Sequence, residues 1–207
     1  MTTRHILSNV TRLAAAVLVA VTTASCGGDL LRTGRAPVFL TIVRLEASPG
    51  GGSEFFSNLL SDVGTSTGAI FNDLGRATLR VELKDQSGVL TGVPAAPTPL
   101  QTVTITRYRV NFRRADGRNT PGVDVPFGFD GAVTQSIAVG DADAVTFDIV
   151  RHANKAEPPL RNLRGLGGQL LISTVAEITF FGRDQNGNEV TVTGIMDVTF
   201  GDFPDAA

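Results

Sequence analysis

Four oxygen-bearing side chains close together near the C-terminal end form a candidate metal site. They are Asp184, Asn186, Asn188 and Glu189. Carboxylate and amide oxygens are the ligands that calcium prefers, and calcium is the one cofactor that the sequence suggests. The spacing then departs from a calcium loop, because Ile195 occupies the twelfth position, where a bidentate acid is expected. A hairpin turn whose polar residues face water explains the same pattern, so both interpretations stay open.

A group of arginines predicts a second candidate site, for an anionic ligand. The group consists of Arg107, Arg109, Arg113 and Arg114. Planar guanidinium groups bind carboxylates, sulfates and phosphates through paired hydrogen bonds. On one solvent-facing side of a strand they would suit envelope polymers or anionic lipid headgroups. The alternative is an ordinary solvated sheet face with cross-strand partners such as Glu82.

Catalytic combinations are few. The serine in residues 64–68 (GTSTG) matches the nucleophile-elbow pattern, and His152 with Asp148 could complete a triad. No alternation of parallel strands and helices surrounds it, so we expect a flexible loop there. Paired carboxylates such as Asp124 and Asp130 leave open a hydrolase that acts on envelope polymers, although we expect no enzyme.

The N-terminal segment reads as an export signal. Arg4 and Arg12 precede a short apolar run, residues 13–21, and small residues follow it. The run is shorter than the 20 or so apolar residues of a spanning helix. Residues 23–26 (TASC) resemble the lipobox of bacterial lipoproteins, which implies that Cys26 is acylated, for example by palmitate, and becomes the new N-terminus. The family pattern usually has Leu where this chain has Thr23; an ordinary secretory signal is the alternative.

The resemblance to lipoproteins divides the chain into three parts. We expect a signal peptide at residues 1–25, a flexible tether at 26–37 and a single folded domain at 38–207. About 11 extended residues reach at most roughly 40 Å, so the domain would sit close to the membrane. Gly27 follows the cysteine where the family's inner-membrane retention signal has Asp, which implies the outer membrane if the cell has one.

Composition excludes some classes of function. Without residues 1–25 the chain keeps 182 residues, with 16 basic and 20 acidic side chains, and this mild negative charge argues against nucleic acid. Cys26 is the chain's only cysteine, and His152 is the only histidine outside the signal. Zinc sites built from cysteine and histidine clusters are therefore excluded.

From residue 38 onward the chain is patterned for strands, because apolar and polar residues alternate between gaps rich in Gly, Pro, Asn and Asp. A shift of phase predicts a β-bulge near Thr106. Asn186-Gly187 predicts a type I′ hairpin turn between the last two strands. The seven predicted strands are residues 38–46, 77–84, 103–113, 133–139, 145–151, 169–181 and 189–200.

Seven strands without a cysteine pair or tryptophan predict an all-β antiparallel sandwich of two sheets. Residues 76–85 (RATLRVELKD) and 181–189 (FGRDQNGNE) resemble the second strand and the last hairpin of bacterial immunoglobulin-like domains of the cell envelope. A short helix is expected in an inserted segment, about residues 50–72, and a long loop at residues 116–131. Such domains mostly serve adhesion, spacing or ligand presentation, which implies a binding or structural role.

The sequence therefore favours a membrane-tethered, non-enzymatic envelope lipoprotein that acts as a binding, adhesion or structural module. Envelope proteins or glycans are the expected partners. The hydrolase is one alternative. The other is an assembly subunit that pairs through an exposed strand edge, for which residues 38–46 are the candidate.

Overall fold

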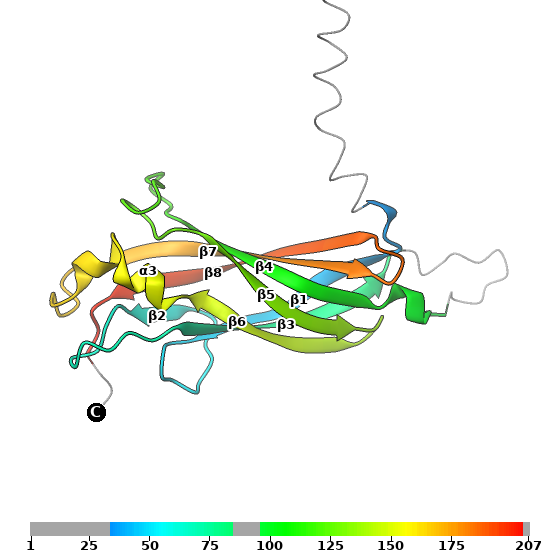
Figure 1. The fold of residues 1–207 in the computed structure, drawn as a ribbon, viewed down its shortest axis with the longest axis horizontal. Coiled ribbons are helices and arrows are strands. Elements are labelled where there is room, and N and C mark those ends of the chain that lie inside the picture. The colour runs from blue at the N-terminus through cyan, green and yellow to red at the C-terminus, as the bar shows by residue number, and fades with distance from the viewer. Residues whose placement is uncertain (1–33, 85–95, 205–207) are drawn as a thin grey trace, which may run out of the picture.

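The computed structural model describes residues 34–84 and 96–204, and these form eight strands with three short helical segments (Figure 1). The signal peptide and Cys26 lie outside the described residues, as does most of the tether. The strands are β1 (Val38–Ser48), β2 (Leu59–Asp62), β3 (Asp73–Leu83), β4 (Val103–Arg113), β5 (Phe129–Ile137), β6 (Ala142–Val150), β7 (Ile172–Asp184) and β8 (Glu189–Gly201). The helical segments are η1 (Pro99–Gln101), α3 (His152–Ala156) and η2 (Leu160–Leu163).

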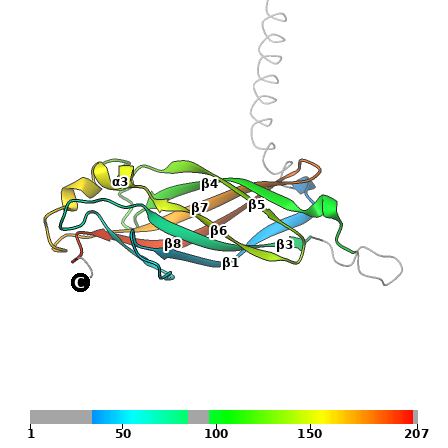
Figure 2. The same cartoon turned by 60° about the horizontal axis from the view of Figure 1, so that its bottom comes forward.

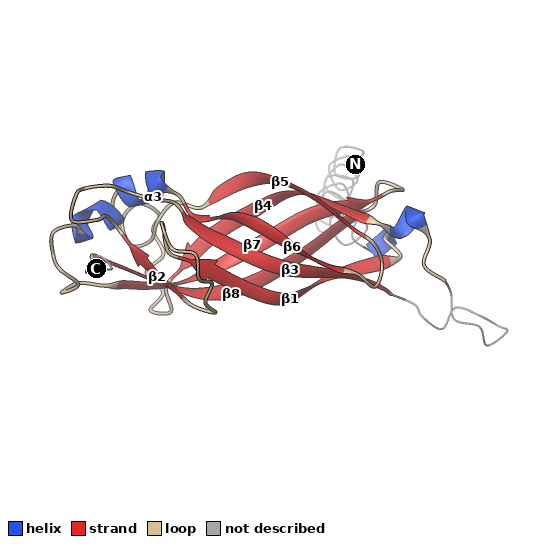
Figure 3. Cartoon of the chain, turned by 90° about the horizontal axis from the view of Figure 1, so that it is seen from below, coloured by secondary structure: helices blue, strands red, loops and turns tan. Residues whose placement is uncertain are grey.

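The strands form two facing sheets, so the all-β prediction is confirmed. The smaller sheet has the order β1-β3-β6, and the larger has the order β2-β8-β7-β4-β5. All pairings are antiparallel except that of β2 with β8, which is parallel. The two sheets are long and lie one over the other, with η1 at one end and α3 at the opposite end (Figures 2 and 3).

The predicted inward faces form the core between the sheets. In β3, Ala77, Leu79 and Val81 are fully buried, while Arg80 between them is exposed. In β4, the buried positions change phase at the predicted place, because the pairing of β4 with both neighbours shifts between Ile105 and Arg107. One extra residue at this point turns the arginines outward and the aromatic residues inward.

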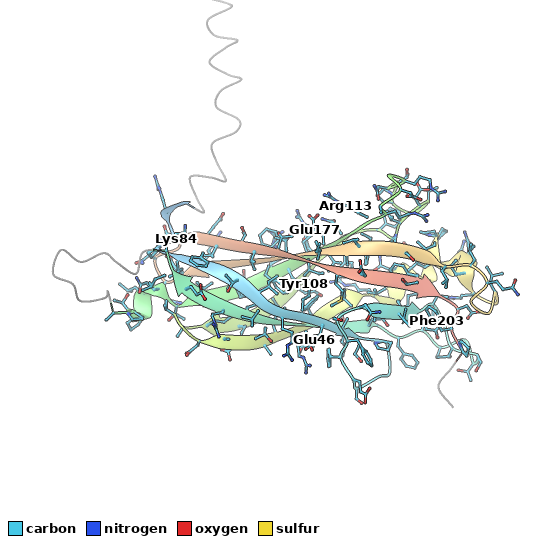
Figure 4. All side chains as sticks on the ribbon, turned by 180° about the vertical axis from the view of Figure 1, so that it is seen from behind. Glu46, Lys84, Tyr108, Arg113, Glu177 and Phe203 are labelled. Carbon is cyan, nitrogen blue, oxygen red and sulfur yellow. The ribbon has the colours of Figure 1, made fainter. Side chains whose placement is uncertain are left out.

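Tyr108 joins the two sheets through the middle of the core, where Figure 4 labels it. Its ring lies against Phe147 of β6 with 5.1 Å between centroids, and Phe147 in turn makes an edge contact with Phe180 at 5.2 Å. The Tyr108 hydroxyl accepts a hydrogen bond of 3.2 Å from the backbone N–H of Asp148 on the opposite sheet. This bond gives the hydroxyl of the buried Tyr108 a partner within the core.

The inserted segment differs from the prediction. No helix forms among residues 50–72, all of which are described; the segment contains β2 instead, which gives eight strands where the sequence predicted seven. Leu59, Ser61 and Val63 are buried and Leu60 between them is exposed, so the segment has the period of a strand. Of the apolar residues near helical spacing, Leu59 and Val63 are buried while Phe56 and Leu60 are exposed, and pairing with the free edge of β8 decides for the strand.

The turn between β7 and β8 also differs from the prediction. A type I′ turn needs a positive φ at two neighbouring residues, here Asn186 and Gly187. Gly187 has a φ of 82°, but in the described parts of the chain only glycines have a positive φ, so the prediction of a type I′ turn is wrong. Gly187 instead closes a turn by donating its N–H to the carbonyl of Asp184 at 3.0 Å. The hairpin itself is confirmed, with register from Ile172 opposite Phe200 to Arg183 opposite Glu189.

Candidate functional site

The outer face of the larger sheet carries three of the four arginines predicted as a binding group. Arg107, Arg109 and Arg113 alternate with buried residues of β4, and their side chains are 43%, 45% and 66% exposed. Arg114 lies one residue beyond the end of the strand and pairs with Asp116 at 2.8 Å. The structure therefore brings three of the predicted residues to one face and separates the fourth from them.

Carboxylates neutralise part of this positive charge. Asp130 of β5 accepts two hydrogen bonds from Arg109, at 2.8 and 3.2 Å, and one from Arg107 at 3.4 Å. The hydrogen bonds from Arg109 lower the pKa of Asp130 and raise that of Arg109. Further along the face Arg113 pairs with Glu177 at 3.5 Å, and Figure 4 labels both side chains. Since one carboxylate serves two arginines, this part of the face keeps an excess positive charge.

Phe181 of β7 is the aromatic residue at the centre of this face. The guanidinium carbon of Arg107 lies 3.9 Å from the centroid of the Phe181 ring, and that of Arg109 lies 5.8 Å from it. On the other side, Arg183 of β7 pairs with Glu189 of β8 at 3.0 Å. A depression of about 200 Å³ lies here, lined by Thr106, Arg107, Phe181, Gly182, Arg183, Glu189 and Thr191.

The four predicted metal ligands do not form one cluster of free oxygens. The buried carboxylate of Asp184 accepts the backbone N–H groups of Asn186 and Asn188, at 2.9 and 2.8 Å, and the Asn188 side-chain amide at 2.8 Å. The carboxylate of Glu189 pairs with Arg183 instead. Within residues 34–84 and 96–204, no group of three or more His, Cys, Asp and Glu is placed to hold a metal ion. The turn's own hydrogen bonds thus account for the pattern.

The residues considered for catalysis have other partners. The backbone N–H and Nδ1 of His152 lie 2.7 and 3.1 Å from Oδ1 of Asn72, whose amide donates to Asp148 at 3.3 Å. Asn72, which the sequence analysis missed, therefore stands between His152 and Asp148. Of the two carboxylates considered for a hydrolase, Asp124 accepts the N–H of Thr120 at 3.2 Å, and Asp130 binds the arginines of β4.

A buried ion pair is a further feature that the sequence analysis missed. Nζ of Lys155 in α3 lies 2.7 Å from Oδ1 of Asp73 at the start of β3, and the two side chains are 2% and 0% exposed. Gly50 donates its N–H to the same oxygen at 2.7 Å, and Ser61 donates its hydroxyl to Oδ2 at 2.5 Å. Burial raises the pKa of Asp73, an effect that the hydrogen bonds and the charge of Lys155 oppose. Nothing in the local sequence marks either residue as buried.

The predicted strand edge is present at β1. This strand pairs with β3 on one side only, and its other side faces the outer edge of β8 across an open groove of about 500 Å³. Val43 and Ile195 beside the groove are 55% and 70% exposed. Two features limit access to the edge: β1 has a bulge between Ile42 and Arg44, and the Ile42 side chain lies over Gly194 of β8.

No protein-family model and no curated protein matches the chain. Among solved structures it is similar to one described as "X-ray structure of Northeast Structural Genomics Consortium target SoR45", with 10% sequence identity, a TM-score of 0.33 and coverage of 80% of this chain and 86% of that chain. A similarity of that size carries no argument about fold or function. No helix within the described residues is long and apolar enough to cross a membrane.

Proposed function

We propose that this protein is a non-enzymatic, membrane-tethered module of the bacterial cell envelope that binds a glycan on the outer face of its larger sheet. The observation that carries the proposal is the Phe181 ring between two charged pairs, Arg107 with Asp130 and Arg183 with Glu189. A sugar ring has an apolar C–H face and a rim of hydroxyls. An aromatic ring flanked by hydrogen-bonding groups is complementary to both.

Arg107 must move away from the Phe181 ring before a sugar can stack on it. Its guanidinium covers the Phe181 ring, and its contact with Asp130 is long, at 3.4 Å. Because the side chain is 43% exposed and Asp130 keeps its closer partner Arg109, Arg107 can leave the ring without stranding a buried charge. A sugar then stacks on Phe181, and the displaced guanidinium can bind its hydroxyl or carboxylate groups.

The immunoglobulin-like type of sandwich is part of the proposal. The order β1-β3-β6 opposite β8-β7-β4-β5 corresponds to strands A-B-E opposite G-F-C-C′ of that fold, which supports the assignment. The lipid anchor at Cys26 and the outer membrane location are proposed from the lipobox resemblance. The start of β1 lies at the end of the domain opposite α3 (Figure 1), so the proposed tether would join the domain at that end.

The glycan site is tested with purified full-length protein and three probes: peptidoglycan sacculi, a neutral glucan and a polyuronate. We expect retention of the wild type on at least one probe and roughly 2- to 12-fold weaker binding by Phe181→Ala, since an aromatic contact contributes roughly 0.5–1.5 kcal/mol. Phe56→Ala is the matched control, because Phe56 is also a surface ring, 48% exposed, and lies beside Ala47 of β1. Binding of Phe181→Ala equal to that of wild type would overturn the proposal, as would failure of all three probes.

The anchor has a separate test. Mass spectrometry of the N-terminal peptide should find an acylated Cys26, and the Cys26→Ala variant should leave the membrane fraction. An unmodified peptide that begins at another residue would contradict lipidation and leave the glycan site untouched.

A second candidate function is assembly through the edge of β1, which the groove beside Val43 and Ile195 favours. An added strand would pair with the unused backbone groups of β1. Replacing Val43 by Lys should then abolish self-association in sedimentation experiments, whereas a protein that is monomeric at all concentrations would refute self-assembly.

A further inference from the structure

We propose that Lys155 and Asp73 condense to form an internal amide bond that links α3 to the start of β3. The two side chains come from positions 82 residues apart in the chain, and Nζ lies 2.7 Å from a carboxyl oxygen. The carboxyl carbon is one further bond of about 1.2 Å away, so the amine is close to the 3–3.5 Å from which attack begins. This inference is independent of the glycan site.

Burial distinguishes this pair from the other ion pairs of the described residues. Each of the others has both side chains at least 17% exposed, whereas Lys155 and Asp73 are 2% and 0% exposed. Away from water the ionised carboxylate loses its hydration, which favours the protonated acid, and a proton that passes to it from Nζ leaves the neutral amine. The raised pKa of Asp73 agrees with this, and the neutral amine and acid are the forms that react.

The surrounding groups hold the carboxyl for attack. The N–H of Gly50 donates to Oδ1 at 2.7 Å and the hydroxyl of Ser61 donates to Oδ2 at 2.5 Å, so both bonds draw electron density away from the carboxyl carbon. The helix that carries the amine is also fixed, because Arg164 donates to the carbonyl of Lys155 at 2.7 Å and to that of Val63 at 3.1 Å. Groups held in this way reach effective concentrations of about 10⁵–10⁸ M.

The reaction needs no other reactant. The lone pair of Nζ attacks Cγ of the protonated Asp73, a bond forms between Nζ and Cγ, and one bond between Cγ and oxygen breaks. That oxygen leaves as water with the carboxyl proton and one proton from Nζ. A cavity of about 20 Å³ beside Lys155 has room for one water molecule. Gly50, Asp62 and Thr65 are among its lining residues and supply polar groups that can bind this water.

The test is peptide mass spectrometry of the full-length protein after denaturation and trypsin digestion. An amide would yield a branched peptide that joins residues 45–76 to residues 152–161. Residues 152–161 stay in one piece because trypsin cannot cleave after an acylated Lys155, and the branched peptide is lighter than the sum of its two parts by the one water lost in the condensation. Lys155→Arg keeps the charge but cannot form the amide, so it should release the linear peptide that contains Asp73. Lys84→Arg, at a lysine outside the pair, should keep the branched peptide.

The readout does not depend on whether a variant folds, because the digestion is carried out on denatured protein and the wild type decides the outcome. Separate, unmodified peptides from the wild type would overturn the proposal, and so would a branched peptide that persists in Lys155→Arg. We also expect the cross-linked wild type to run faster than Lys155→Arg on a denaturing gel after boiling, because an internal bond keeps the chain more compact.

Discussion

Replacing Gly75 by alanine should destabilise the protein through one contact in the core. Gly75 of β3 pairs in register with Phe147 of β6, and the Phe147 ring lies across the glycine. A Cβ at position 75 would lie 2.4 Å from Cζ of the ring and 2.6 Å from Cε2, well inside van der Waals contact. The ring has little room to move away, because Tyr108 and Phe180 lie against it with centroids at 5.1 and 5.2 Å.

The expected cost is that of an overpacked core, about 1–3 kcal/mol. For a domain of this size, each kcal/mol lowers the melting temperature by roughly 2–4 °C, so we expect Gly75→Ala to melt about 2–12 °C below wild type in a calorimetric or circular dichroism scan. Gly64→Ala is the matched control, since the nearest atom to its Cβ would be Nε of Arg164, at an ordinary 3.5 Å. We expect this variant to melt at or slightly above the wild-type temperature.

A second substitution shows whether the ring is the cause. Phe147→Leu makes room for the new methyl group, so the double variant should be more stable than the sum of the two single effects predicts, by about 0.5 kcal/mol or more. A wild-type melting temperature for Gly75→Ala would refute the packing described for this part of the core. Strictly additive effects in the double variant would show that the cost arises elsewhere.

Three further predictions concern polar groups. Tyr108→Phe leaves the part-buried N–H of Asp148 without this acceptor and should cost about 0.5–1.5 kcal/mol in denaturant unfolding, with an unchanged midpoint as the contrary result. Asp184→Ala removes the acceptor of three hydrogen bonds in the β7–β8 turn and should lower the midpoint similarly, while calcium should leave the wild-type melting temperature unchanged. The pKa of Asp130, measured by NMR, should lie below the usual value of about 3.9, and Arg109→Gln should raise it; a normal pKa in the wild type would contradict the pairing. Because the folded-state pKa is depressed, the small stabilisation from this pairing is present above about pH 4 and is lost as the pH falls through the folded-state pKa.

The sequence by itself determined the features that depend on alternation along one strand. Which side chains of β3, β4, β7 and β8 face the core follows from a period of two, and the bulge near Thr106 follows from a break in that period. The outward position of Arg107 and Arg109 follows from the same rule. These features are local, because the backbone of an extended strand fixes them wherever the strand lies in the fold.

Only the tertiary structure decided which distant residues meet. Residues 59–62 form a strand rather than a helix because β8 offers them a free edge, and Asp130 serves two arginines because β5 pairs beside β4. Lys155 appears in the sequence as a residue of a polar loop, and only the packing of α3 against the start of β3 buries it against Asp73. An ionisable side chain has the same sequence signature whether it faces water or a partner 82 residues away, since the energy that distinguishes the two arises from burial and pairing in the folded chain.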